Sequence, residues 1–147
     1  MKNILAAIDF SDVSSIVVEK AAELAESFNC KLWLIHIAAP DPDFVGYGTA
    51  PTFRRESRAE TLKQEHRYLH DKALELGENG IDVTPLLVQG ATIETILKEA
   101  SKLEVDTIVI GSHGHGSLYK TLVGSVSEGI IRQASCPVLV VPARTKV

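Results

Sequence analysis

Five short apolar runs alternate along the chain with segments in which apolar residues recur every three or four positions. The runs NILAAID, KLWLIHIA, IDVTPLLV, VDTIVIG and PVLVVPA occupy residues 3–9, 31–38, 81–88, 105–111 and 137–143. Runs that are apolar at consecutive positions are typical of strands buried on both faces, as in a parallel sheet. The alternation therefore predicts an α/β fold, a single doubly wound five-stranded parallel sheet flanked by helices on both faces.

Four helices are predicted between these runs. The first carries an apolar stripe from Ile16 through Leu24 to Phe28, and the second runs from about 54 to 76 and stops at Gly77 and Gly80. Two further stripes run over 93–100 and 126–134. A chain of 147 residues suits one domain, 1–147, with a single core that buries about two-thirds of its unfolded surface.

The segment 38–53, AAPDPDFVGYGTAPTF, is rich in Pro, Gly and Asp. A loop of this length in a compact domain is usually a binding lid or a plain mobile connection, and both interpretations stay open.

Charge and composition exclude several classes of protein. A formal charge of −4 gives no net field to attract a nucleic-acid backbone. No run approaches the roughly 20 apolar residues of a membrane helix, and MKNILAAIDFSD is too short and acidic for a signal peptide. Cys30 and Cys136 lack metal-type spacing, so both are expected to be reduced core thiols. We expect a cytoplasmic protein that binds neither nucleic acid nor membrane.

Ligands of doubly wound sheets bind beyond the carboxyl ends of the strands. Three predicted strand ends are candidates for such a site. They are the end of the first run at Asp9, the end of the second run at Ile37, and the loop GSHGHGSLYKTLVGS after the fourth run. Glycines in that loop let backbone N–H groups approach an anion, and the helix start after it adds unpaired donors. The loop is therefore predicted to hold a phosphate group.

Rival glycine motifs do not fit this loop. A Walker loop needs Lys and Ser or Thr after its last glycine, whereas Ser117 and Leu118 follow Gly116. A dinucleotide fingerprint starting at Gly114 has Tyr119 at its third glycine position. The pattern that fits is G-x2-G-x9-G-[ST], satisfied by Gly111, Gly114, Gly124 and Ser125.

This pattern resembles the ATP-binding branch of the universal stress protein family. The resemblance covers the whole chain and includes ILAAIDFSD, LIHI and the closing CPVLVVP. It implies a Rossmann-like fold of the adenine nucleotide alpha hydrolase type, ATP or another adenine nucleotide as ligand, Mg²⁺ as its companion, and a homodimer formed through the last strand at 138–141.

The resemblance also implies a set of site residues. Asp9 is expected near the ribose, and the backbone of Ile37 near the adenine. The phosphates are expected among loop and helix residues, namely Gly111, Ser112, His113, Gly114, Gly124, Ser125, Val126 and Ser127. Ala7 and Ile8 offer no polar side chain, so Asp9 supplies the only side-chain hydrogen bond expected from its turn.

Structural roles compete with these assignments. Ser125 and Glu128 also fit a capping box, and Asp9 beside Ser11 fits a helix cap. His36 is expected to be a buried, hydrogen-bonded core residue.

The other histidines divide into two kinds. His66 and His70 stand four apart, a metal-type spacing, but are expected on a solvated helix face. His113 lies inside the glycine loop and could donate to phosphate when protonated.

The leading function is a regulatory nucleotide-binding protein. A slow ATPase or phosphotransferase is the enzymatic alternative, although no catalytic residue is assigned because no base stands out near Asp9 and Asp12. A nucleotide-free adaptor of the same fold is the third class.

Overall fold

The computed structural model describes residues 1–38, 52–113 and 123–143, with the backbone alone for 52–57. Strands and helices alternate along the described chain. The strands are β1 (Asn3–Ala7), β2 (Lys31–Ala38), β3 (Val83–Gln89), β4 (Thr107–Gly111) and β5 (Val138–Val141). The helices are α1 (Ser14–Phe28), α2 (Thr52–Glu78), α3 (Thr92–Lys102) and α4 (Ser125–Gln133).

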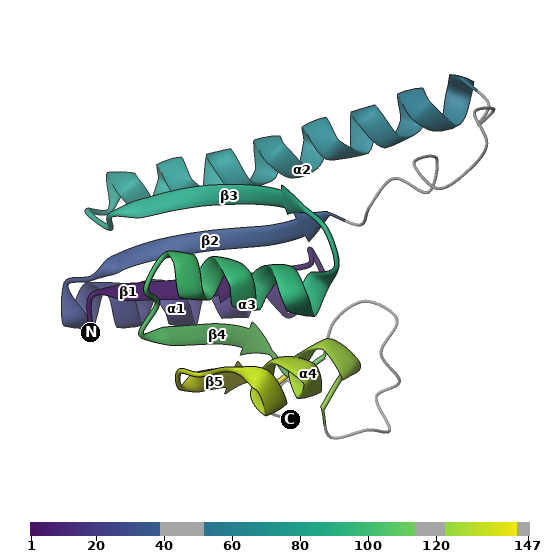
Figure 1. The fold of residues 1–147 in the computed structure, drawn as a ribbon. Coiled ribbons are helices and arrows are strands. Elements are labelled where there is room, and N and C mark those ends of the chain that lie inside the picture. Colours follow the sequence, from purple (N-terminus) through teal and green to yellow (C-terminus); the bar gives the residue numbers. More distant parts are fainter. Residues whose placement is uncertain (39–51, 114–122, 144–147) are drawn as a thin grey trace.

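The five strands form one parallel sheet in the order β3-β2-β1-β4-β5 (Figure 1). The chain starts at β1, moves outward to β3, and then returns to place β4 on the other side of β1. The β1–β4 register pairs are Ile4↔Thr107, Leu5↔Ile108 and Ala6↔Val109. The predicted fold class is confirmed, and the order reverses between β1 and β4, where ligands of such sheets bind.

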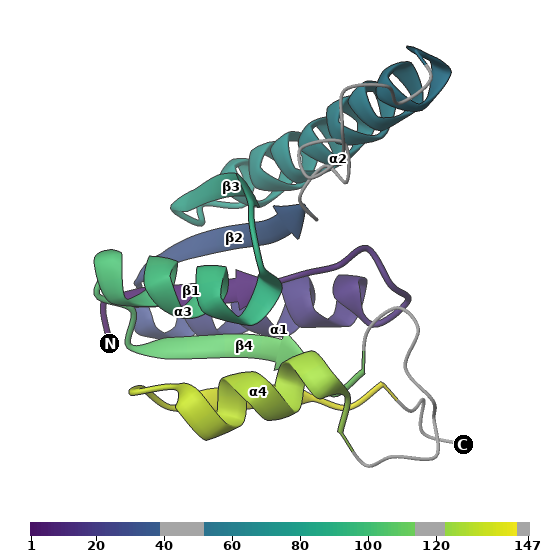
Figure 2. The same ribbon diagram turned by 45° about the vertical axis from the view of Figure 1, so that its right-hand side comes forward.

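Each face of the sheet is covered by two helices, α1 and α2 on one side and α3 and α4 on the other (Figures 1 and 2). Side chains of a strand alternate between faces, so Ile4 and Ala6 of β1 pack against α1 while Leu5 packs toward α3 and α4. All three are fully buried. This burial on both faces explains why β1 is apolar at consecutive positions.

Two helix ends differ from their predictions. Phe28 of α1 is 54% exposed, because it lies in the last turn, just before the left-handed Asn29 that ends the helix. The capping box at α4 is wrong. Gly124 occupies the N-cap position with no side-chain hydrogen bond, Ser125 is already helical, and Glu128 pairs with Arg132 at 2.8 Å.

The second predicted helix is longer than expected. It passes through Gly77 to Glu78, and the turn follows at Gly80, whose φ of 88° suits glycine. Among the described residues, no helix combines the length and apolar character needed to cross a lipid bilayer.

Both cysteines are free thiols. Cys30 is buried and Cys136 half-buried, and desolvation raises the pKa of each thiol above its ordinary value.

Asp106 ties the start of β1 to the start of β4. Its Oδ2 accepts hydrogen bonds from the backbone N–H groups of Lys2 at 2.6 Å and Asn3 at 2.8 Å, and these bonds lower the pKa of the carboxyl. A depressed pKa in the folded state adds stability above the ordinary value of 3.8, and this stability is lost as the pH falls through the folded pKa.

We therefore expect Asp106→Asn to lower the midpoint of urea unfolding at pH 7. The difference from the parent protein should shrink as the pH falls below the ordinary value of 3.8. Asp71→Asn, on the exposed side of α2, serves as the matched control. A deficit that stays constant from pH 7 to pH 3 contradicts the role of the charge.

Candidate ligand cavity at the switch point

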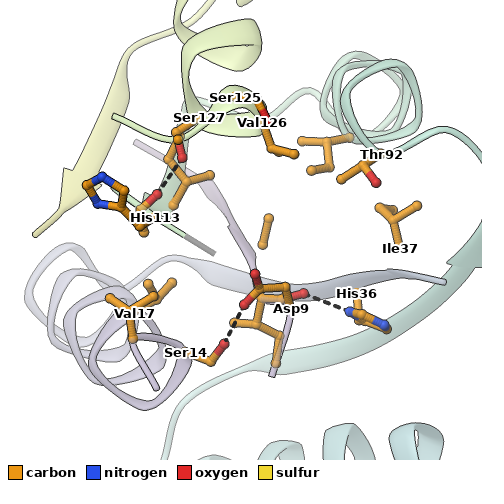
Figure 3. Close-up of a pocket in the computed structure, with 17 residues that line it drawn as sticks. Asp9, Ser14, Val17, His36, Ile37, Thr92, His113, Ser125, Val126 and Ser127 are labelled. Atoms are coloured by element: carbon orange, nitrogen blue, oxygen red, sulfur yellow. Dashed lines mark hydrogen bonds between the residues drawn. The ribbon is translucent and has the colours of Figure 1, made fainter. Parts of the chain in front are cut away.

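A cavity of about 270 Å³ lies at the carboxyl end of the sheet, where the strand order reverses (Figure 3). The ends of β1, β2 and β4 and the starts of α1, α3 and α4 surround it. Of the residues predicted from the sequence, the following line it: Asp9, Ile37, Gly111, His113, Gly124, Ser125, Val126 and Ser127. Ser112 does not line the cavity, and Gly114 lies outside the described residues.

The Asp9 carboxylate shapes the turn after β1. Its Oδ1 accepts hydrogen bonds from the backbone N–H of Ser11 at 3.0 Å, from the Ser11 hydroxyl at 2.5 Å and from the Ser14 hydroxyl at 3.2 Å. The predicted link between Asp9 and the helix start is thus real, although Val13 occupies the N-cap position itself. Asp9 holds its own turn and at the same time faces the cavity.

The backbone of Ile37 points toward the cavity. Backbone N–H and C=O groups alternate sides along a strand, and Ile35 directs its carbonyl toward β1, where it accepts from the Ile8 N–H at 2.9 Å. Ile37, two residues later, directs its groups the same way, but β1 ends at Ala7. Beyond that end lies the cavity, so a planar ligand with a donor and an acceptor on one edge could pair with Ile37.

Short hydrogen bonds hold both ends of the glycine loop together. The Gly124 N–H donates to the Ser112 carbonyl at 2.7 Å, and the Ser127 hydroxyl donates to the Gly111 carbonyl at 2.6 Å. These bonds place the start of α4 beside the end of β4, so the first turn of α4 faces the cavity with Ser125 and Val126 exposed. Backbone N–H groups in a first helical turn have no partner inside the helix and favour anions.

Ser112 has a supporting role that the sequence did not indicate. Its side chain is buried beside the end of β5, where Oγ accepts from the Ala143 N–H at 2.9 Å and lies 3.0 Å from Nδ1 of His113. The imidazole of His113 points away from the centre of the cavity (Figure 3). In this orientation Nδ1 lies beside Ser112, and donation from the ring to a phosphate stays a prediction.

Packing alone is enough to require glycine at position 111, whatever its role toward a ligand. A Cβ at this position would lie 2.6 Å from Cγ1 of Val13 on the neighbouring turn. The glycine lets the start of α1 approach the end of β4 closely.

Other residues line the cavity that sequence reasoning did not assign to it. They are Ala7, Ile8, Val13, Ser14, Val17, His36, Thr92, Ile96 and Ile110. Thr92 could have been found, because it follows the carboxyl end of β3 and the strand-end rule applies there too. His36 is buried and hydrogen-bonded as expected, but it also reaches the cavity wall.

The paired histidines lie elsewhere. His66 and His70 are exposed on α2 with nearly parallel rings, 6.1 Å between centroids. Within residues 1–38, 52–113 and 123–143 no group of three or more His, Cys, Asp or Glu side chains could hold a metal ion. The predicted loop 38–53 lies almost wholly outside the described residues.

A doubly wound parallel sheet, a cavity at its switch point and a helix start facing that cavity define an α/β protein built to hold a small ligand. The model of the Universal stress protein family matches residues 1–142, and the chain belongs to this family.

Known proteins resemble the chain along its whole length. Universal stress protein A homolog 1 of Coxiella burnetii is 36% identical over 144 residues, which cover 95% of each chain. The solved structure of MJ0577 from Methanocaldococcus jannaschii superposes with a TM-score of 0.85 at 28% identity and covers 99% of this chain and 98% of its own.

Two solved universal stress proteins that share the fold contain nucleotides. A protein from Archaeoglobus fulgidus in complex with dAMP is 21% identical, with a TM-score of 0.67 over 95% of this chain and 97% of its own. Another, in complex with cAMP, is 21% identical, with a TM-score of 0.72 over 97% of this chain and 98% of its own.

Proposed function

We propose that the protein binds an adenine nucleotide, ATP foremost, in the switch-point cavity and serves as a regulatory nucleotide-binding protein. The observation that carries the proposal is the convergence of three different groups on one cavity: the backbone of Ile37, the carboxylate of Asp9 and the first turn of α4. Each suits one part of a nucleotide. The dAMP and cAMP complexes of two relatives support an adenine nucleotide as the ligand.

The parts of the ligand follow from the chemistry of the wall. Adenine presents a donor and an acceptor on one edge, which matches the backbone of Ile37. Ribose hydroxyls donate to a carboxylate, which matches Asp9, whereas a phosphate beside Asp9 would be repelled. The phosphates then lie at Gly124, Ser125 and Val126, where the helix N-terminus favours negative charge.

Magnesium held by protein ligands does not fit the described part of the site. Asp9 is the only carboxylate among the lining residues described, and its Oδ1 already accepts three hydrogen bonds from serines. Any Mg²⁺ that accompanies ATP is therefore expected to be bound through the phosphates. Among the described lining residues near α4, His113 is the candidate base, and its ring points away from the centre of the cavity (Figure 3), which favours binding with slow hydrolysis at most over an ATPase or phosphotransferase.

The last strand supports a homodimer as part of the proposal. β5 lies at the edge of the sheet and Leu139 is 40% exposed, with Val138 and Val140 only half-buried. An open apolar edge strand favours pairing with another strand, and a second copy of β5 is the partner that the family resemblance implies.

Native mass spectrometry of the freshly purified protein tests the ligand and the oligomer together. We expect a dimer whose mass rises by one adenine nucleotide per chain, with ATP displacing AMP, and no comparable binding of GTP. Phosphate release with Mg²⁺ should stay far below the turnover of about 1 s⁻¹ at which typical enzymes begin. The proposal is overturned if no adenine nucleotide is bound at millimolar ATP. Rapid release of phosphate would instead make the protein an enzyme.

A further inference from the structure

His36 holds the peptide group that leads into Asp9. It lies near the end of β2, is 8% exposed, and places Nδ1 2.8 Å from the carbonyl oxygen of Ile8 (Figure 3). A carbonyl oxygen only accepts hydrogen bonds, so Nδ1 must carry the proton and donate. The other ring nitrogen, Nε2, is then a bare acceptor unless the ring holds a second proton.

Nε2 faces a carboxylate. It lies 3.3 Å from Oε2 of Glu65 on α2, an ion-pair distance, and the two side chains are only 10% and 19% exposed. Glu65 Oε2 is itself buried and has no well-directed hydrogen bond. A carboxylate facing a bare nitrogen in this setting would be costly, whereas a shared proton turns the contact into an attraction. The 3.3 Å distance and the burial of both side chains thus fit an ion pair between His36 and Glu65.

Phe10, the residue after Asp9, packs against His36 and α2. Phe10 has a φ of 62°, a left-handed conformation that an aromatic residue rarely adopts. Its ring lies 4.3 Å from the His36 ring and 5.1 Å from that of Tyr68, centroid to centroid. Glu65 and Tyr68 stand three apart on α2 and therefore share one face of the helix. Both peptide neighbours of Asp9 are thus held by His36, and His36 by α2.

We propose that His36, paired with Glu65, is a positioning residue that keeps the Asp9 turn in its ligand-binding shape. The inference rests on the proposed function, because Asp9 is the residue expected to hold the ribose. It makes nucleotide affinity depend on the docking of α2. Loss of the pair between His36 and Glu65 loosens α2, Phe10 and the Ile8–Asp9 peptide together, so affinity falls.

Calorimetry with AMP at pH 7.5 tests the pair. We expect Glu65→Ala to weaken AMP binding about tenfold. Glu65→Gln should recover most of this loss, because its amide donates to a neutral Nε2. His70→Gln, at an exposed histidine of the same helix, should keep the affinity of the parent protein.

Amide exchange at Ser11 without nucleotide separates the two proposals, since this N–H donates to Asp9. Exchange at Ser11 should be faster in Glu65→Ala and restored in Glu65→Gln, even if the parent protein were to bind no AMP and the proposed function failed. Parent-like Ser11 exchange and AMP affinity in Glu65→Ala overturn the positioning role.

Discussion

Gly124→Val should weaken the binding of ATP at least about tenfold, or about 1.4 kcal/mol. Gly124 is buried in the wall of the cavity beside the first turn of α4, so a branched side chain there takes the space assigned to the phosphates. Its φ of −71° and ψ of 163° are accessible to valine, and its N–H still reaches the Ser112 carbonyl. The effect should therefore appear in calorimetric affinity rather than in folding.

Gly77→Val is the matched control for this substitution. Gly77 lies on α2, and no heavy atom outside its own helix comes within 4 Å of an added Cβ. We expect parent-like affinity for ATP and equal or slightly higher stability, because valine has a higher helix propensity than glycine. Equal ATP affinity in Gly124→Val and in the parent protein, with both chains folded, contradicts the assignment of the phosphates to this wall.

Asp9→Asn should reduce the affinity for AMP by about tenfold to a hundredfold, the range that corresponds to the loss of a hydrogen bond to a charged group. The asparagine keeps one oxygen for Ser11 and Ser14 but presents an amide NH₂ in place of the second acceptor oxygen. The loss should be smaller for dAMP, which lacks the 2′-hydroxyl. Calorimetry with both ligands and both proteins gives the coupling between Asp9 and that hydroxyl.

The same cycle separates two roles of Asp9. If Asp9 acts only by holding its turn, AMP and dAMP should lose affinity equally. Asp9→Ala, which also removes the bonds to Ser11 and Ser14, should then lower the melting temperature as well as the affinity.

The architecture was predictable because its signals are local. β1 and β4 are apolar at consecutive positions since both faces of the sheet are covered, and this is visible in the sequence without any knowledge of pairing. Helix ends were less predictable. The N-cap of α4 is Gly124, one residue before the predicted Ser125, because the helix begins after an extended glycine and no serine side chain caps it.

The cavity was predictable where strand ends carry unusual residues and not elsewhere. Asp9 follows the end of β1 and Gly111 ends β4, so the strand-end rule finds both. Ser112 and His36 depend on contacts across the fold, with Ala143 and with Glu65. No spacing in the sequence encodes such pairs, because their separation is set by how the strands are ordered in the sheet.

The order of the strands also determines when the cavity can exist during synthesis. The ribosome releases β1, β2 and β3 first, and these can pair before Thr107 is made. Until then the edge of β1 that later pairs with β4 is open. Ile4, Leu5 and Ala6 pair there with three residues of β4 that lie about a hundred positions later in the chain. An open apolar edge invites wrong pairing. The nascent chain is thus most vulnerable in the interval between Gln89 and Gly111, and the proposed nucleotide can offer no protection there, because α4 has not yet been made.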